Sequence, residues 1–155
     1  MHYTDCVSSI RVRLLEIAYI CTSRILHLFR RWLGSGGVVE KGFILLENVT
    51  KRPVFGCQMC GQCVLHNTGM TCPMNCPKNL RNGPCGGVRV DGNCEILPKM
   101  ECVWVKAWNR SRKMAVYAES ILEIQPPLNR SLKGSSAWIN DMTGRDKENS
   151  GRFKS

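Results

Sequence analysis

The sequence has no long uncharged apolar run, which is the first requirement for a membrane-spanning helix. The run Ile17–Ser23 is bounded by Glu16 and Arg24, and its length falls far short of the ~20 residues that a bilayer requires. Asp5 places an acid within the first five residues, which argues against an export signal. We therefore expect a cytoplasmic chain, whose cysteines stay reduced and available to metals.

The chain also lacks the length and the motifs of a large catalytic scaffold. Its 155 residues suffice for one ordinary domain, or for one small core with long arms. A (βα)8 barrel takes about 250 residues, and the sequence carries neither a flavin-binding motif nor a side chain that we identify as a general acid. We therefore expect no self-contained active site, and any barrel chemistry would belong to a partner.

Acidic residues are scarce, with 12 Asp and Glu against 22 Lys and Arg and a formal net charge of +10. The excess lies on the flanks: residues 1–56 carry eight basic and four acidic side chains, and residues 106–155 carry ten and five. Residues 57–105 carry four and three. The basic balance favours an acidic partner, whether nucleic acid, a membrane surface or an anionic cofactor. Nucleic acid is less favoured, because the middle segment has few bases.

The first element that the sequence predicts is an amphipathic helix over residues 8–33. Its apolar residues recur at spacings of three and four, which places them on one stripe. The stripe consists of Leu14, Ala18, Cys21, Ile25, Leu28 and Trp32. The glycine-rich run 34–37 would end the helix. Three uses of the stripe remain open: packing on its own domain, docking a partner, or lying on a membrane surface.

We expect three segments along the chain: the helix and a linker over 1–39, a cysteine-rich metal-binding domain over 40–140, and a disordered tail over 141–155. The fold class that follows is a small, metal-stapled α+β fold. It would have an irregular cysteine-rich core with a short hairpin, flanked by the N-terminal amphipathic helix and by C-terminal helices plus an extended arm.

Local signals within the cysteine-rich domain predict its secondary structure. Residues 88–96 are typical of a hairpin with a three-residue loop. Pro98 favours a helix start, and the helix that follows would carry Trp104 and Trp108 one turn apart. A short helix is expected near 114–124, where two prolines stop it, and the extended arm comes next.

Eight of the ten cysteines fall in one block. They are Cys57, Cys60, Cys63, Cys72, Cys76, Cys85, Cys94 and Cys102. Eight is two sets of four, the number that two tetrahedral zinc sites or two [4Fe–4S] clusters require. Cys6 and Cys21 lie outside the block and are interpreted as small apolar residues. Disulfides are a third possibility, disfavoured because the chain shows no export signal.

The spacing favours iron–sulfur clusters over zinc. Cys57, Cys60 and Cys63 form an unbroken C-x-x-C-x-x-C run, which can hold three corners of a cubane, whereas zinc sites draw pairs from separate places. A Cys-Pro pair supplies a further ligand in bacterial ferredoxins, and both Cys72 and Cys76 precede proline. The gap after the third cysteine is eight residues here, against three in the ferredoxin pattern. Zinc therefore stays open, and His66 would be either a polar loop residue or a substitute ligand.

Several motifs in order make the sequence similar to a known family. The segments "CPMNCPK", "NGPCGG" and "CVWVKAW", together with the eight cysteines and the later "IQPPLNRSLKGSSAW", resemble the methylenetetrahydrofolate reductase C-terminal-like domain over about residues 43–140. They also resemble the small cysteine-rich partner subunit of two-subunit methylenetetrahydrofolate reductases.

The resemblance implies a non-catalytic accessory subunit in one-carbon folate metabolism. Its partner would be a flavin-bearing (βα)8 barrel reductase subunit, so flavin is expected only in that partner. On this interpretation the eight block cysteines hold two metal centres that connect the flavin with an external donor, such as a ferredoxin. The alternative is a zinc-stapled interaction module without a redox role.

Overall fold

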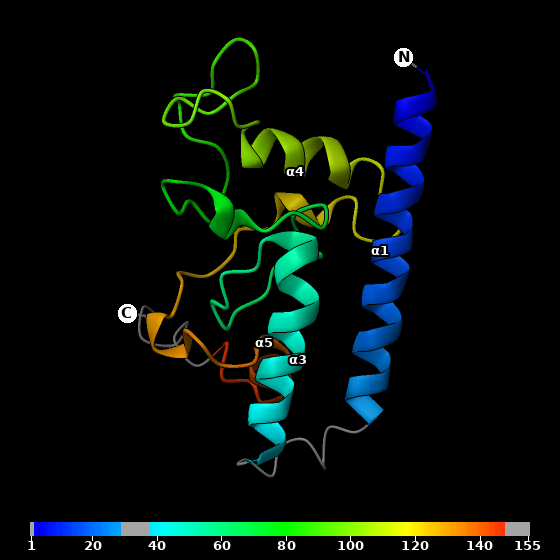
Figure 1. Ribbon diagram of the computed structural model, residues 1–155, viewed down its shortest axis with the longest axis vertical. Helices are drawn as coiled ribbons and strands as arrows, with labels where there is room; N and C mark the ends of the chain where they lie inside the picture. The colour runs from blue at the N-terminus through cyan, green and yellow to red at the C-terminus, as the bar shows by residue number, and fades with distance from the viewer. Residues whose placement is uncertain (1, 29–37, 148–155) are drawn as a thin grey trace. The chain divides into compact units, whose positions relative to one another are not determined.

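The computed structural model describes residues 2–28 and 38–147 (Figure 1). This part of the chain is mostly helical and contains no strand. Its α-helices are α1 (His2–Leu28), α3 (Val38–Phe55), α4 (Val103–Ser111) and α5 (Ala137–Thr143). Three 3-10 helices are η1 (Pro73–Asn75), η2 (Ser120–Leu122) and η3 (Arg130–Leu132). The chain divides into two compact units, Met1–Ile20 with Val64–Gln125 and Cys21–Cys63 with Pro126–Ser155.

In the first unit, α1 is fixed by one buried face. Val12 and Glu16 are each 1% exposed, and the segment that follows α4, yellow in Figure 1, meets them. Both carboxylate oxygens of Glu16 accept backbone N–H groups there, from Ala115, Val116 and Tyr117 at 2.8–2.9 Å. A carboxylate with three N–H donors is satisfied although it is buried. An acid therefore anchors this helix.

The described residues of the apolar stripe predicted for this helix are exposed. Leu14, Ile25 and Leu28 are all more than half exposed. The buried face lies on the opposite side of the helix, because Val12 and Glu16 are about half a turn away from Leu14 and Ile17. Of the three uses left open for the stripe, packing on its own domain is wrong for Leu14, which lies in the first unit with its side chain exposed. Trp32 and the glycine run at 34–37 lie outside the described residues.

The core of the first unit forms around α4. Cys102, Trp104 and Ala107 are buried together, and Val88, Val105 and Ile121 pack against them. Trp104 and Trp108 lie one turn apart on α4, as predicted. Gly69 lies against the same helix with φ +58°, and a Cβ there would lie 2.5 Å from Ala107 O and 2.6 Å from Ser111 N. Glycine is required at 69 for its conformation and for its closeness to α4.

Substituting alanine at this position is expected to destabilise the protein. Gly69→Ala should cost about 2–4 kcal/mol, because the left-handed backbone and the clash with helix backbone both oppose it. Gly42→Ala is the matched control: it lies inside α3, where a Cβ meets nothing within 4 Å, so it should be neutral or slightly stabilising. Urea unfolding of both variants provides the measurement, and equal midpoints would contradict the packing described for Gly69.

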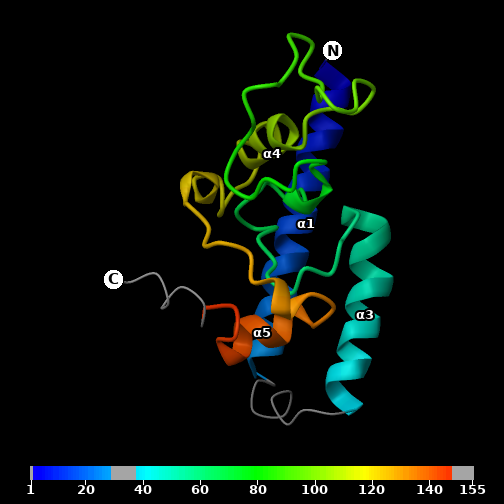
Figure 2. The ribbon, with the colours of Figure 1, turned by 90° about the vertical axis from the view of Figure 1, so that its left-hand side faces the viewer.

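The second unit joins α3 to α5 through a second buried acid (Figure 2). Glu47 accepts the backbone N–H groups of Ala137 and Trp138, both at 3.1 Å, and Lys51 donates to it at 3.1 Å. The Lys51 ammonium also lies 4.6 Å from the ring centroid of Trp138. Ser136 Oγ accepts the N–H of Ile139 as an N-cap. The first three N–H groups of α5 are therefore all satisfied.

The predicted hairpin at 88–96 is wrong. Instead of two paired strands, a tight turn is closed by Arg89 N–H to Asn93 O (3.0 Å), and Cys94 N–H then pairs onward with Met100 O (2.9 Å). An isolated bridge joins Asn93 and Glu101. Val90 is fully exposed, so the alternating valines have no apolar surface to cover. The β part of the predicted α+β class is therefore wrong.

Other boundaries differ from the predicted ones. The helix expected at Pro98 begins at Val103, because turns through Met100 intervene. Residues 114–124 form turns and only the short η2. The arm predicted to be extended contains η3 and α5 instead, and α5 together with the turn up to residue 147 lies partly in the predicted tail. Residues 148–155 lie outside the described residues, and α3 was not predicted.

None of the helices described is both long enough and apolar enough to cross a membrane.

Candidate metal centre

Four of the predicted ligands line one small cavity in the first unit. They are Cys76, Cys85, Cys94 and Cys102. The rest of the wall is largely apolar and includes Val88, Val103 and Trp104, while Lys78 and Glu95 supply its charges. Its free volume is about 10 Å³, close to that of one water-sized sphere. Cysteines that lie up to 26 positions apart in the sequence thus share one wall.

Short turns bring these four cysteines to the lining of one cavity. Cys76 follows η1, and its N–H donates to Pro73 O at 3.0 Å. The turn that ends at Met100 brings Cys94 back, and Cys102 N–H donates to Gly92 O at 3.0 Å. Cys102 is also the N-cap of α4 and is 8% exposed. The positive end of the helix dipole therefore lies beside Cys102, which suits this residue to a ligand's role.

A charged pair stands beside this group of thiols. The ammonium of Lys78 donates to Glu95 Oε1, and Cys85 Sγ lies 3.8 Å from the same oxygen. The hydrogen bond from Lys78 holds the pKa of Glu95 below its usual value and raises the pKa of Lys78. Both groups are therefore charged at neutral pH, and Lys78 brings positive charge to a sulfur-rich wall. Neither residue was predicted from the sequence, where they lie 17 positions apart. The one signal for them is weak: few charged residues accompany the cysteines, so each of those few is a candidate.

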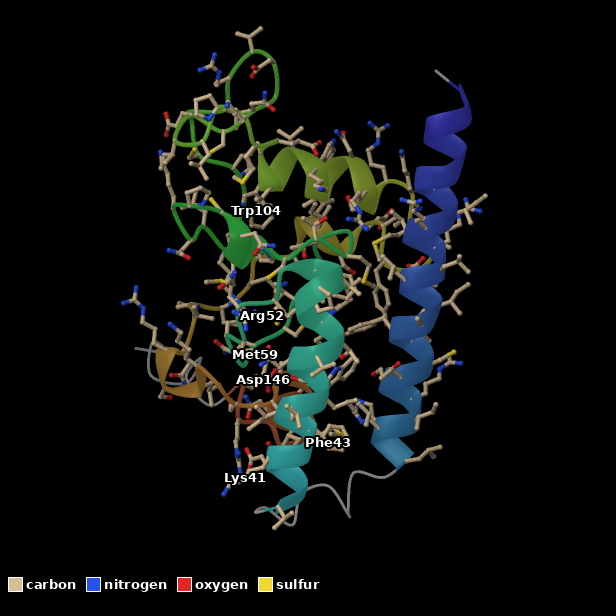
Figure 3. The ribbon with its side chains drawn as sticks, viewed as in Figure 1. Lys41, Phe43, Arg52, Met59, Trp104 and Asp146 are labelled. Atoms are coloured by element: carbon tan, nitrogen blue, oxygen red, sulfur yellow. The ribbon has the colours of Figure 1, made fainter. Side chains whose placement is uncertain are left out.

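The C-x-x-C-x-x-C run forms a loop in the second unit, directly after α3. Two of its backbone oxygens are held by the C-terminal segment: Met59 O accepts Gly134 N–H, and Gly61 O accepts Asn140 Nδ2, both at 2.8 Å. Gln62 adds a bond to Asp146 O at 2.8 Å; Met59 and Asp146 are labelled in Figure 3. The side chain of Asn140 is fully buried. The residues around the three thiols are therefore fixed by chain that lies about 70–85 positions later.

One backbone N–H in this loop donates to sulfur, the kind of contact that stabilises a thiolate ligand. Met59 has φ +48°, and its N–H donates to Cys57 Sγ at 3.4 Å. Burial raises the pKa of the Cys57 thiol, and this N–H together with the nearby Lys51 opposes part of that rise. The loop thus supplies partial stabilisation for a thiolate, and a bound cation would supply more.

The eight predicted ligands lie in three different places in the structure. Four share the cavity wall, three form the loop after α3, and Cys72 is buried directly before η1 in the first unit. None of the nine cysteines whose side chains are described forms a disulfide. Within the described part of the chain, no three Cys, His, Asp or Glu side chains are arranged so as to hold a metal ion. The eight ligands therefore stay predictions.

His66 packs among aromatic rings of the first unit. Its Nδ1 lies 2.9 Å from the hydroxyl of Tyr19, whose ring stacks on the imidazole at 5.4 Å between centroids. Tyr117 contacts the same imidazole edge-on at 5.4 Å. His66 is thus a polar residue of a turn, as the first of its two predicted roles has it, and its ring helps α1 to pack on the unit.

Comparison with known proteins gives one match. A family described as "Methylene-tetrahydrofolate reductase C terminal" matches residues 37–131, which is more than half of the chain. The match covers all eight block cysteines and excludes α1. No curated protein matches, and no solved structure matches.

Proposed function

Because the chain belongs to the methylene-tetrahydrofolate reductase C-terminal family, we propose that it is the metal-binding accessory subunit of a methylenetetrahydrofolate reductase-type flavoprotein. In this role it relays single electrons between a donor, such as a ferredoxin, and the flavin of a separate barrel subunit. The observation that carries the proposal is the group of four thiols on one cavity wall within the matched segment.

The donor set of this cavity suits a thiolate-bound metal centre. Cys76, Cys85, Cys94 and Cys102 supply four sulfurs, and the N-terminus of α4 and Lys78 supply positive potential beside them. An iron–sulfur cluster, when bound, supplies one-electron transfer; the chain's own residues hold it, exclude water and set its surrounding charge.

The second candidate is a zinc-stapled module without a redox role. One observation favours it: the free volume among the four thiols, about 10 Å³, is what a single ion needs. The unbroken triple run favours a cluster instead.

Anaerobic purification followed by metal and sulfide analysis separates the two candidates. The relay proposal expects iron and acid-labile sulfide in equal amounts and a visible thiolate-to-iron absorbance that dithionite bleaches. A colourless protein with stoichiometric zinc would reject the relay and support the zinc module. Co-purification of a flavin-containing barrel subunit tests the partner separately.

We further propose that α1 docks this subunit onto its acidic barrel partner. Ile10, Leu14 and Ile17 are more than half exposed on the face opposite the buried one. Exposed Arg11 and Arg13 border this face, and Glu16, the single acid in the sequence between residues 9 and 28, is buried. A second copy would place arginines against arginines, whereas an acidic partner surface complements them. The helix lies outside the family match and so adds this surface to the family's domain.

Leu14→Asp is expected to weaken binding of the barrel subunit at least tenfold, because a buried leucine contributes about 1.5–3 kcal/mol. Metal content should stay unchanged, since α1 carries none of the predicted ligands. Val90→Asp places the same charge at a fully exposed valine elsewhere in the first unit and should leave binding intact. Sedimentation of the purified subunits measures the affinity; equal affinity for both variants would reject docking through this face.

A further inference from the structure

The first unit contains a second and much larger cavity, of about 420 Å³. Trp104, Val105 and Trp108 of α4 form one wall, and Ile121, Leu122 and Ile124 form another. This volume is in the range of cavities that hold small molecules. None of the eight predicted metal ligands lines it, so it is separate from the four-thiol cavity.

The cavity is held open by hydrogen bonds of two asparagines. Asn82 makes a two-way bond with the backbone of Gln125: its Nδ2 donates to Gln125 O, and its Oδ1 accepts Gln125 N–H, both at 2.8 Å. Asn67 Nδ2 donates to Ser120 O at 3.3 Å and to Glu123 Oε2 at 3.0 Å. The wall segment 120–125 is therefore tied at both ends. A cavity fixed in this way does not have to be opened by its ligand.

The polar groups that surround the cavity are largely occupied within the protein. Asn82 and the Nδ2 of Asn67 make the bonds just described, and Thr68 Oγ1 donates to backbone oxygens at 2.6 and 2.9 Å. Asn67 Oδ1 is the exception, since it is buried and accepts no hydrogen bond, so a ligand with one donor such as a hydroxyl suits this wall. The indole N–H of Trp104 donates to Leu80 O at 3.1 Å. What remains for a ligand is mainly apolar and aromatic surface, which disfavours a charged or highly polar molecule.

The two tryptophans favour a flat ligand. They lie four positions apart on one face of α4, and Trp108 is 46% exposed, so one indole has surface to offer. Aromatic rings gain from stacked or edge-on contact with another ring, beyond the gain from burial. Trp104, a residue of α4 that is labelled in Figure 3, also belongs to the wall of the four-thiol cavity. A single side chain therefore borders both cavities.

We propose that this cavity binds a neutral, planar aromatic system of two or three fused rings and holds it against α4, one side chain from the four thiols. The binding itself depends only on the fold of the first unit. The statement that the bound ring lies beside a metal centre rests on the proposed function. The ring can belong to a free small molecule or to an aromatic side chain of a partner protein.

Two probes with the same carbon skeleton test the ring's planarity. 2-Naphthol is flat, neutral and aromatic, and decahydro-2-naphthol is its saturated counterpart. We expect 2-naphthol to bind the anaerobically purified full chain at least tenfold more tightly, measured by calorimetry. Equal affinities would show an unspecific apolar surface and would overturn the proposal.

Variants on two walls locate the binding. Trp108→Ala should weaken 2-naphthol binding about tenfold to a hundredfold, because burial and ring contact are both lost. Leu122→Asp, at a side chain that is 70% exposed on the facing wall, should do the same by introducing a charge; because this side chain is exposed, the variant is not expected to unfold. Ile96→Ala is the control, since Ile96 is an exposed apolar side chain outside the cavity. Unchanged binding in both wall variants would reject the site.

Two further measurements test separately whether the ring comes from a partner protein or a small molecule, and whether the proposed function is correct. N-acetyl-tryptophanamide that competes with 2-naphthol supports a partner's side chain, and failure to compete supports a free small molecule. Metal analysis of the same samples identifies the centre. If the protein contains zinc and binds 2-naphthol, the electron-relay function is rejected and the proposed aromatic site is supported. An iron–sulfur protein that does not bind it would reject the cavity alone.

Discussion

Cys94→Ser is expected to remove one of the two proposed metal centres and to leave the other in place. Cys94 is one of four thiols on the same cavity wall, and a serine hydroxyl is a poor replacement for a thiolate ligand. Metal binding to such sites contributes about 10 kcal/mol or more to folding. The first unit should therefore lose stability together with its metal. Metal-to-protein ratio and thermal unfolding measure the two effects.

A set of matched variants tests which cysteines belong to the same metal centre. Cys76→Ser should give the same half-loss as Cys94→Ser, and the double variant should lose no more metal than either one. Cys60→Ser lies in the other loop and should remove the remaining centre when combined with Cys94→Ser. Cys21→Ser, at an exposed cysteine outside the block, is the control and should change nothing. Additive losses for Cys76 and Cys94 would show that they serve different centres.

Some of the fold could be predicted because its causes are local. The helical repeat over residues 8–28 gives α1, and the Trp104–Trp108 spacing gives a helix with both indoles on one face. The cysteine block likewise stands out without any structure, since eight thiols fall within 46 residues. Each of these signals depends on residues that are close in the sequence, either within one or two turns of a helix or within one cysteine-rich segment.

The wrong predictions concern segments whose structure depends on contacts between residues that lie far apart in the sequence. Glu16 looked like an interruption of an apolar stripe, yet N–H groups about 100 positions later satisfy it and bury its face. Valines at 88 and 90 suggested a strand, but the chain returns to Met100 instead. The α3 helix contains Gly42 and Pro53, which weaken a helical signal. Tertiary partners override the local pattern at each of these positions.

The grouping of thiols could not be derived from spacing alone. Both Cys72 and Cys76 precede proline and so satisfy the same sequence rule. Only the turns through 89–102 and the start of α4 show that Cys76 shares a wall with Cys85, Cys94 and Cys102. The large cavity was equally hidden, because its walls come from segments that lie far apart in the sequence.

Glu16→Gln is expected to destabilise the protein by about 2–4 kcal/mol at neutral pH, since a charged acceptor of three N–H groups is replaced by an amide. Burial by itself raises the pKa of Glu16, but the N–H donors of residues 115–117 and the charge of Arg13 outweigh it and hold the pKa below its usual value. A group with a lowered folded-state pKa stabilises the protein above the pKa of the unfolded chain, about 4.3. That contribution is lost as pH falls through the folded-state pKa. Urea unfolding across this pH range measures it.

The difference in stability between the natural chain and Glu16→Gln should therefore stay constant at neutral pH and shrink in acid. Below the folded-state pKa both chains present an uncharged group to the same donors, so the gap should nearly close. Glu119→Gln removes the same charge from an exposed site of the first unit and should show a difference of under about 0.5 kcal/mol at every pH. A gap for Glu16→Gln that does not change with pH would mean that shape, and not the ionised carboxylate, anchors α1.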